Sequence, residues 1–236
     1  MTALRRVRWH HPELEAAVVA GGAWLLLLAP VVGGETVSAV HDRAHASVPL
    51  LAGALAWLLM VIAMMIPTTL AAARYVGLTA LWRRRRLTVV EFLAAYVAAW
   101  GAFGAIALPV AAIAPRALGT SEESVLAGVL AVAAAWELTP WKWRSVRSCH
   151  RHEPLPPAGR RAHAACIASG IRYGARCMGA CWPAMAAMAV AGHAQLGLMA
   201  LLTVVLTAEK LALQPARLAR PAAGMLVGTV LVTLAA

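Results

Sequence analysis

The amino-acid sequence predicts an all-α membrane protein, a polytopic bundle of about seven transmembrane helices. Of its 236 residues, 61% are hydrophobic and only 13% are charged, and the mean hydropathy is +0.72. A soluble domain of this size has roughly 45–50% apolar and about 25% charged residues, so this chain has too little polar surface to face water on all sides. The apolar residues also fall into runs of about 20, the length with which a helix crosses a bilayer.

The spans are expected where uncharged apolar runs reach this length. The first run follows the basic residues Arg5, Arg6 and Arg8 and is too long for a cleavable signal, so we expect it to be an anchor. A tight turn is expected between the fifth and sixth runs, because only residues 192–194 separate them. In chain order, the expected spans are 14–34, 48–70, 89–113, 124–140, 174–192, 195–213 and 220–236.

Positive charge gathers on one side of these spans. With the N-terminus in the cytoplasm, nineteen of the 21 Lys and Arg residues fall inside, and only Arg43 and Arg116 fall outside. This asymmetry is typical of multi-pass proteins of the inner (plasma) membrane, whose partner is the lipid bilayer. It also explains the net charge of +11, so no nucleic-acid partner is expected. The longest connection, 141–173, is then a cytoplasmic loop of a single transmembrane domain, 1–236.

The most informative segment contains Cys177, Cys181 and Pro183, near the start of the fifth span. In a helix, cysteines four residues apart share a face and can give two sulfur ligands to one soft metal ion. Pro183 removes a hydrogen bond to the carbonyl of Gly179, which predicts a kink beside the cysteines. The alternative is that both cysteines pack as small hydrophobic residues.

Two methionines of the second span, Met60 and Met64, share a helix face in the same way. Their thioethers suit Cu(I) and few other ions, although methionine is also an ordinary core residue.

Two later spans carry charges near their inner ends: Glu137 with Lys142, and Glu209 with Lys210. A carboxylate inside a bilayer faces a partner or a water-filled cavity, unless it snorkels to the interface. Glu209 and Lys210 are adjacent and point about 100° apart, so we expect each to have a partner on another helix.

The soft and acidic side chains of four spans fall at a similar depth. At about 1.5 Å per residue, Met64, Cys181, Glu137 and Glu209 all lie roughly 5–10 Å from the inner ends of their spans. This predicts one Cys/Met/carboxylate site in the cytoplasmic half of the bundle.

Two other groups of chelating residue types are weaker candidates. The outer side offers His41, Asp42, His45 and His193 in short connections, and the inner loop offers Cys149, His150 and His152 beside Arg147 and Arg151. The positive charge of those arginines opposes binding of a cation. No phosphate-binding glycine loop or nucleotide motif is present, and no catalytic triad can be argued from spacing, so the chain is not expected to be an enzyme.

From about residue 50 nearly to its C-terminus the chain resembles a bacterial family of uncharacterised domains described as predicted metal-binding integral membrane proteins. The resemblance implies metal binding and adds Cys149 and Trp182 to the residues of interest. It rests on Trp57, Met60, Ala63, Met64, Met65, Pro67, Glu137, Leu138, Thr139, Pro140, Lys142, Cys149, Gly174, Cys177, Gly179, Cys181, Trp182, Met185, Met199, Glu209 and Lys210.

The chain departs from that family at three positions. Ser145 and Ala180 stand where the family tends to have further cysteines, and His193 stands in place of an asparagine. A site of four thiolates is therefore not expected. Two thiolates with methionine favour Cu(I), and two thiolates with Glu137 or Glu209 favour Zn(II).

The sequence therefore predicts a membrane protein for transition-metal handling or delivery, most simply of copper, with Cys177 and Cys181 as ligands. A membrane protein or a metallochaperone is the expected protein partner. Two alternatives stay open: a scaffold subunit of a membrane complex, in which Cys and Met only pack, and a small proton-coupled transporter that uses Glu137 and Glu209.

Overall fold

The protein is all-α, as its sequence predicts. A computed structural model describes residues 11–33, 50–151, 154–156, 159–192, 195–212 and 214–235, and every regular element within these ranges is a helix. The α-helices are α2 (Leu14–Val32), α4 (Leu50–Met65), α5 (Leu70–Thr79), α6 (Arg85–Leu118), α7 (Glu122–Glu137), α8 (Pro140–Cys149), α9 (Arg160–Ala191), α10 (Leu196–Leu211) and α11 (Ala219–Ala235). Two short 3₁₀ helices, η1 (Pro67–Thr69) and η2 (Pro215–Leu218), precede α5 and α11.

The helices that are long and apolar enough to cross a membrane are fewer than the seven expected spans. In the described residues α6 and the segment Ala216–Ala235 meet this criterion alone, and two bent pairs, α4 with α5 and α7 with α8, meet it together. That gives two crossing helices, or up to four. Other apolar elements are short: α10 has 16 residues, about 24 Å of helix, and carries Glu209 and Lys210 in its last turn. The seven-span count therefore stays a prediction.

The connection expected over 141–173 is mostly helical. Thr139 begins α8, because its side chain accepts a hydrogen bond from the backbone N–H of Lys142, and Pro140 fits the first helical turn. After Gly159, which has a φ of 83°, α9 starts at Arg160 and runs without interruption into the expected fifth span. Alanines are frequent in this first part of α9, and alanine favours helix.

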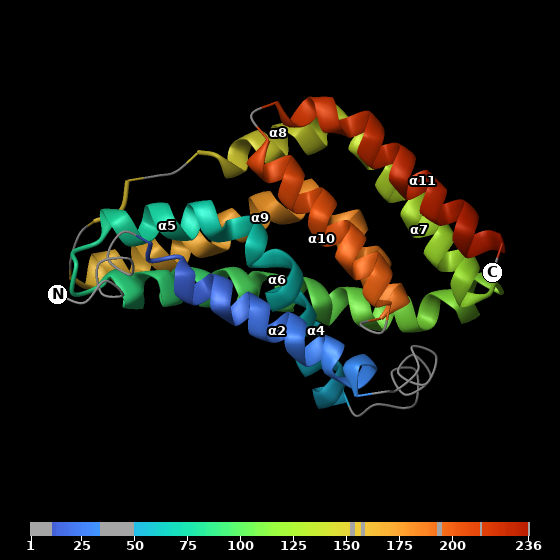
Figure 1. Cartoon of the computed structure of the whole chain (residues 1–236), viewed down its shortest axis with the longest axis horizontal. Coiled ribbons are helices and arrows are strands. Elements are labelled where there is room, and N and C mark those ends of the chain that lie inside the picture. Colours follow the sequence, from blue (N-terminus) through green and yellow to red (C-terminus); the bar gives the residue numbers. More distant parts are fainter. Residues whose placement is uncertain are drawn as a thin grey trace.

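The long helices α6 and α9 pack against each other along the body of the molecule (Figure 1). Small residues allow this approach: a Cβ added at Gly174 would lie 2.9 Å from the Cβ of Ala99. Other extensive helix pairs are α7 with α11 and α2 with α4. The largest buried cluster draws side chains from α4, α6, α9 and α10, among other helices.

Two proline-associated bends shape this core. The pair α4 and α5 is bent by 47° next to Pro67. In α9 the backbone is non-helical at Cys181, with φ −135° and ψ 17°, two residues before Pro183. The kink expected beside the cysteines is confirmed.

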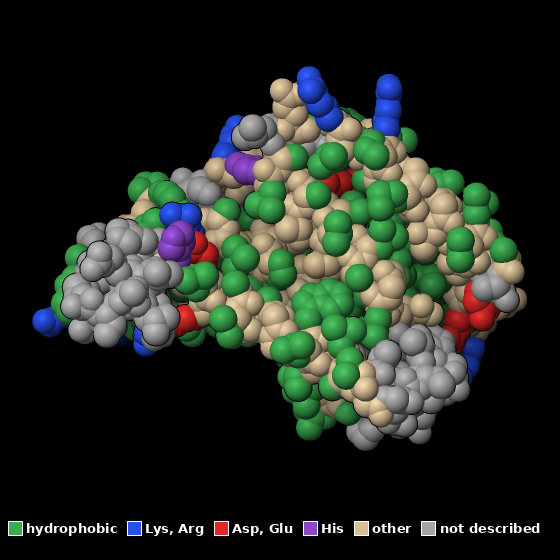
Figure 2. Space-filling model, in the orientation of Figure 1, with side chains coloured by type: hydrophobic (Ala, Val, Ile, Leu, Met, Phe, Trp, Pro, Cys, Tyr) green, Lys and Arg blue, Asp and Glu red, His purple; other side chains and the backbone are tan. Residues whose placement is uncertain are grey.

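The surface is strongly apolar on the helices that surround the core. Figure 2 shows hydrophobic side chains spread over the middle of one face, with Lys and Arg at its margins. Exposed large hydrophobic residues include Leu25 and Leu26 of α2, Ile106 and Val110 of α6, and Val232 of α11. Such exposure is expected where lipid rather than water covers a helix.

Candidate functional site

The two cysteines of α9 form a close, buried pair. The Sγ atoms of Cys177 and Cys181 are 3.7 Å apart, and the residues are 0% and 2% exposed. Both are free thiols rather than a disulfide. The four-residue spacing therefore brings the sulfurs together as expected.

Cys177 is surrounded by hydrogen-bond donors. The ammonium group of Lys210 on α10 lies 2.8 Å from its Sγ, and the hydroxyl of Tyr96 on α6 lies 3.1 Å from it. Lys210 also donates to the hydroxyl of Thr68 at 2.9 Å, and its Nζ lies 5.8 Å from the ring centre of Tyr173. A sulfur that faces an ammonium at this distance is stabilised as a thiolate.

Cys181 has a different role in the pair. Its Sγ lies 3.0 Å from the backbone carbonyl of Cys177, an acceptor for its S–H. The pair thus combines one sulfur beside an ammonium with one beside a backbone carbonyl. Binding of a metal by both sulfurs releases the proton of Cys181, because a ligating cysteine is deprotonated.

Two tryptophans lie beside the kink, and one of them hydrogen-bonds the backbone carbonyl that the proline leaves without a donor. Pro183 cannot donate to the carbonyl of Gly179, and that oxygen instead accepts a hydrogen bond from Nε1 of Trp136 at 3.3 Å. The ring of Trp182 packs edge-on against Trp136, with 5.8 Å between the ring centres. Trp182, which the resemblance marks as important, is 37% exposed and supports the kink from outside the sulfur cluster.

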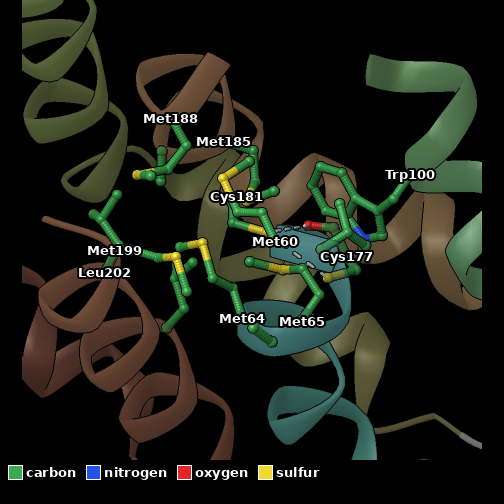
Figure 3. Packing of buried hydrophobic residues seen from close by; sticks show 14 of the residues in the cluster. Met60, Met64, Met65, Trp100, Cys177, Cys181, Met185, Met188, Met199 and Leu202 are labelled. Atoms are coloured by element: carbon green, nitrogen blue, oxygen red, sulfur yellow. Dashed lines mark hydrogen bonds between the residues drawn. The ribbon is translucent and has the colours of Figure 1, made fainter. Parts of the chain in front are cut away.

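Methionines complete a sulfur-rich core around the cysteine pair (Figure 3). Met60 and Met64 of α4 are 2% and 0% exposed and belong to the same buried cluster as Cys177 and Cys181. Four more methionines of the cluster were not anticipated as a group: Met65, Met185, Met188 and Met199, each 0% exposed. The spacing of Met185 and Met188 after Cys181 carries a signal, because residues 177, 181, 185 and 188 fall on one helix face.

The two glutamates expected in the site bind a lysine instead. The ammonium of Lys142 on α8 contacts the carboxylate of Glu137 and donates to that of Glu209 at 2.8 Å. All three residues are at most 4% exposed. Within the described chain, no three His, Cys, Asp or Glu side chains are close enough to share a metal ion. The expectation that Glu209 and Lys210 have partners on different elements is confirmed by Lys142 and Cys177.

The remaining cysteines, Cys149 and Cys166, belong to the same buried cluster as the pair. Cys149 is buried at the end of α8, and the next residue, His150, contacts the backbone carbonyl of Lys210 at 2.9 Å. Cys166, earlier on α9, donates to the carbonyl of Thr88 at 3.0 Å. Burial raises the pKa of Cys166 to about 11, so it stays a neutral thiol at physiological pH. The weaker candidates His41, Asp42, His45, His152 and His193 lie outside the described residues.

Residues 54–233 match the model of a family described as PpoB2, copper chaperone. No curated protein and no solved structure matches the chain. The matched region contains the cysteine pair, Lys210 and all six methionines of the cluster.

Proposed function

Because the chain belongs to the PpoB2 copper chaperone family, we propose that it is a membrane protein that binds Cu(I) and passes it to a protein partner. The ligands in this proposal are Cys177 and Cys181, with Met60 as a neutral third sulfur. The observation that carries the proposal is the buried pair of sulfurs 3.7 Å apart.

The sulfur separation fits a single bound ion. With metal–sulfur bonds of about 2.3 Å, two ligating sulfurs can be at most about 4.6 Å apart. The Cys177–Cys181 separation of 3.7 Å lies inside this limit, so both sulfurs can reach one ion with little rearrangement. Thiolate and thioether ligands together favour Cu(I) over harder divalent ions.

The charge of Lys210 favours Cu(I) over Zn(II). Two thiolates and Cu(I) carry one net negative charge, which the ammonium 2.8 Å from Cys177 neutralises. Two thiolates and Zn(II) are already neutral, so the same ammonium would add an uncompensated buried charge. An uncompensated charge away from water is costly.

The glutamates hold the site together in this proposal. Glu137 ends α7, Lys142 lies on α8 and Glu209 lies near the end of α10, so their buried contacts join three helices beside the kink in α9. We assign Glu137 and Glu209 to this structural role rather than to the metal.

The bilayer is the proposed environment, with the multi-pass location in the plasma membrane expected from the sequence. Support comes from the hydrophobic content of 61% and from α6, whose 34 residues measure about 51 Å at 1.5 Å per residue. A metallochaperone or a membrane-bound acceptor of copper is the proposed partner, since a delivery protein requires one.

Anaerobic titration with Cu(I) against a chromogenic competitor tests the function. We expect tight Cu(I) binding by the purified protein, and one Cu(I) per chain less in the Cys177→Ala/Cys181→Ala variant. Cys166→Ala is the matched control, because it removes another buried cysteine of α9 that lies away from the pair. Equal Cu(I) binding by wild type and the double variant, or none by either, would contradict the proposal.

A further inference from the structure

We propose that the chain has a second Cu(I) site made only of thioethers, formed by Met64 of α4, Met188 of α9 and Met199 of α10. This inference relies on the proposed function only for the identity of the metal. The site would accept Cu(I) from the cysteine pair, or supply it, inside the same buried cluster.

The first observation is a row of sulfurs along α9. Cys177, Cys181, Met185 and Met188 are spaced by four, four and three residues and are all at most 2% exposed. Such spacing keeps side chains on one face within a helix, and although α9 is kinked at Cys181, all four residues belong to the same buried cluster. At about 1.5 Å per residue, Met188 is roughly 10 Å beyond Cys181 along the axis, too far to ligate the same ion.

The second observation is that methionines of two other helices face this far end of the row. Met64 and Met199 are both 0% exposed, and α10 packs against both α4 and α9. In Figure 3 the side chains of Met64 and Met199 extend toward one another, on the side of the cluster away from Cys177 and Trp100. Met188 lies on the same side. Three helices therefore each supply one thioether.

The third observation is the composition of the core. Six of the twelve largest fully buried side chains in the described chain are methionines, although methionine makes up only 9 of the 236 residues. For packing alone, leucine fills a core with better-defined rotamers, and methionine is used sparingly. Half of the largest buried side chains can therefore offer a thioether sulfur to a soft metal ion.

The end of α9 favours a monovalent cation at this place. Met188 lies in the last turn of α9, which ends at Ala191, and the C-terminal end of a helix carries partial negative charge. Thioethers are neutral and suit Cu(I) but not hard or divalent ions. A Met-only site also has no ligand proton to lose, so acid does not weaken it as it weakens a thiolate site.

The test is Cu(I) binding by the full chain in detergent, at neutral pH and at about pH 5, well below the ordinary thiol pKa. We expect about two Cu(I) per chain for wild type and about one for the Cys177→Ala/Cys181→Ala variant. The ion retained by that variant should persist at the lower pH. The variant Met64→Leu/Met188→Leu/Met199→Leu should lose this acid-resistant ion and keep the one at the cysteines.

A control and a direct readout separate binding from folding. Met65→Leu removes an equally buried methionine of the same cluster and should keep both ions. X-ray absorption of the Cys177→Ala/Cys181→Ala variant grown with selenomethionine should show copper bonded to selenium.

The outcomes for the two sites are distinct. A folded cysteine variant that binds no Cu(I), while wild type binds one, would overturn the thioether site and leave the proposed function standing. Copper held by that variant without selenium ligands would also overturn it. Wild type that binds no Cu(I) at all would contradict both proposals.

Discussion

Replacement of Lys210 by leucine, which offers no metal ligand, tests whether its charge selects the metal. The ammonium lies 2.8 Å from the Sγ of Cys177, and the residue is 8% exposed, so solvent screens this pair little. At an effective dielectric constant of about 20, two unit charges at that distance interact by about 6 kcal/mol. Desolvation offsets part of this, and loss of one partner of a buried pair costs about 3–5 kcal/mol.

We therefore expect Lys210→Leu to weaken Cu(I) binding by about two to three powers of ten, at about 1.4 kcal/mol per factor of ten. Zn(II) binding should improve relative to Cu(I), because the Zn(II) dithiolate needs no counter-charge. Competition titrations with both metals measure the ratio. Lys210→Arg, which keeps the charge, is one matched control. Thr68→Val is the other, because it removes the 2.9 Å hydrogen bond to Lys210 and the hydroxyl's own bond to the carbonyl of Met65 but keeps the ammonium.

Two results would refute this reasoning. One is a folded Lys210→Leu protein with wild-type affinity for Cu(I). The other is an equal loss of affinity for Cu(I) and Zn(II), which would assign Lys210 to holding the shape of the site and not to selecting the ion.

Three further predictions concern stability and reactivity. Lys142→Met leaves two buried carboxyl groups facing each other without a cation, so it should lower the free energy of unfolding by about 3–5 kcal/mol, measured by denaturation in detergent. A loss below about 1 kcal/mol would show that water already screens the two carboxyl groups. Gly174→Ala places a Cβ 2.9 Å from the Cβ of Ala99 across the α6–α9 contact and should lower the free energy of unfolding by about 1–3 kcal/mol. Gly128→Ala, with open space around the new Cβ, should not destabilise the protein, and equal effects of the two variants would contradict the packing argument. Because the pKa of Cys166 is raised to about 11, its labelling by a thiol reagent should stay slow up to about pH 9 and accelerate as the pH rises toward 11. Mass spectrometry of the Cys149→Ala/Cys177→Ala/Cys181→Ala variant measures this labelling, and rapid labelling of the folded protein at neutral pH would refute the burial of Cys166.

Local rules of the chain predicted the geometry at the kink. The spacing of Cys177 and Cys181 placed their sulfurs on one face, and Pro183 predicted both the bend and the freed carbonyl of Gly179. These features follow from hydrogen bonds and side-chain directions within one helix, so a few consecutive residues are enough to define them.

The helices between the expected fourth and fifth spans were not predicted from the sequence. The segment 141–173 is basic and contains three prolines, features that indicate a loop, yet α8 and the first half of α9 occupy most of it. Pro140 stands in the first turn of α8, where proline is tolerated, and the other prolines precede α9. The positions of the prolines relative to the helix starts, rather than the number of prolines in the segment, decided that it is helical.

The sequence by itself determined the helical class, the apolar surface, the cysteine pair and the kink, because composition and spacing within one helix are properties of short stretches of chain. Only the tertiary structure decided which charge faces which group. Lys210 contacts Thr68, 142 residues away, and Cys177, 33 residues away, while both glutamates converge on Lys142. Such contacts depend on how whole helices cross and rotate against one another. The depth of a residue along its span gives its height in the bundle, but not which neighbouring helix its side chain faces.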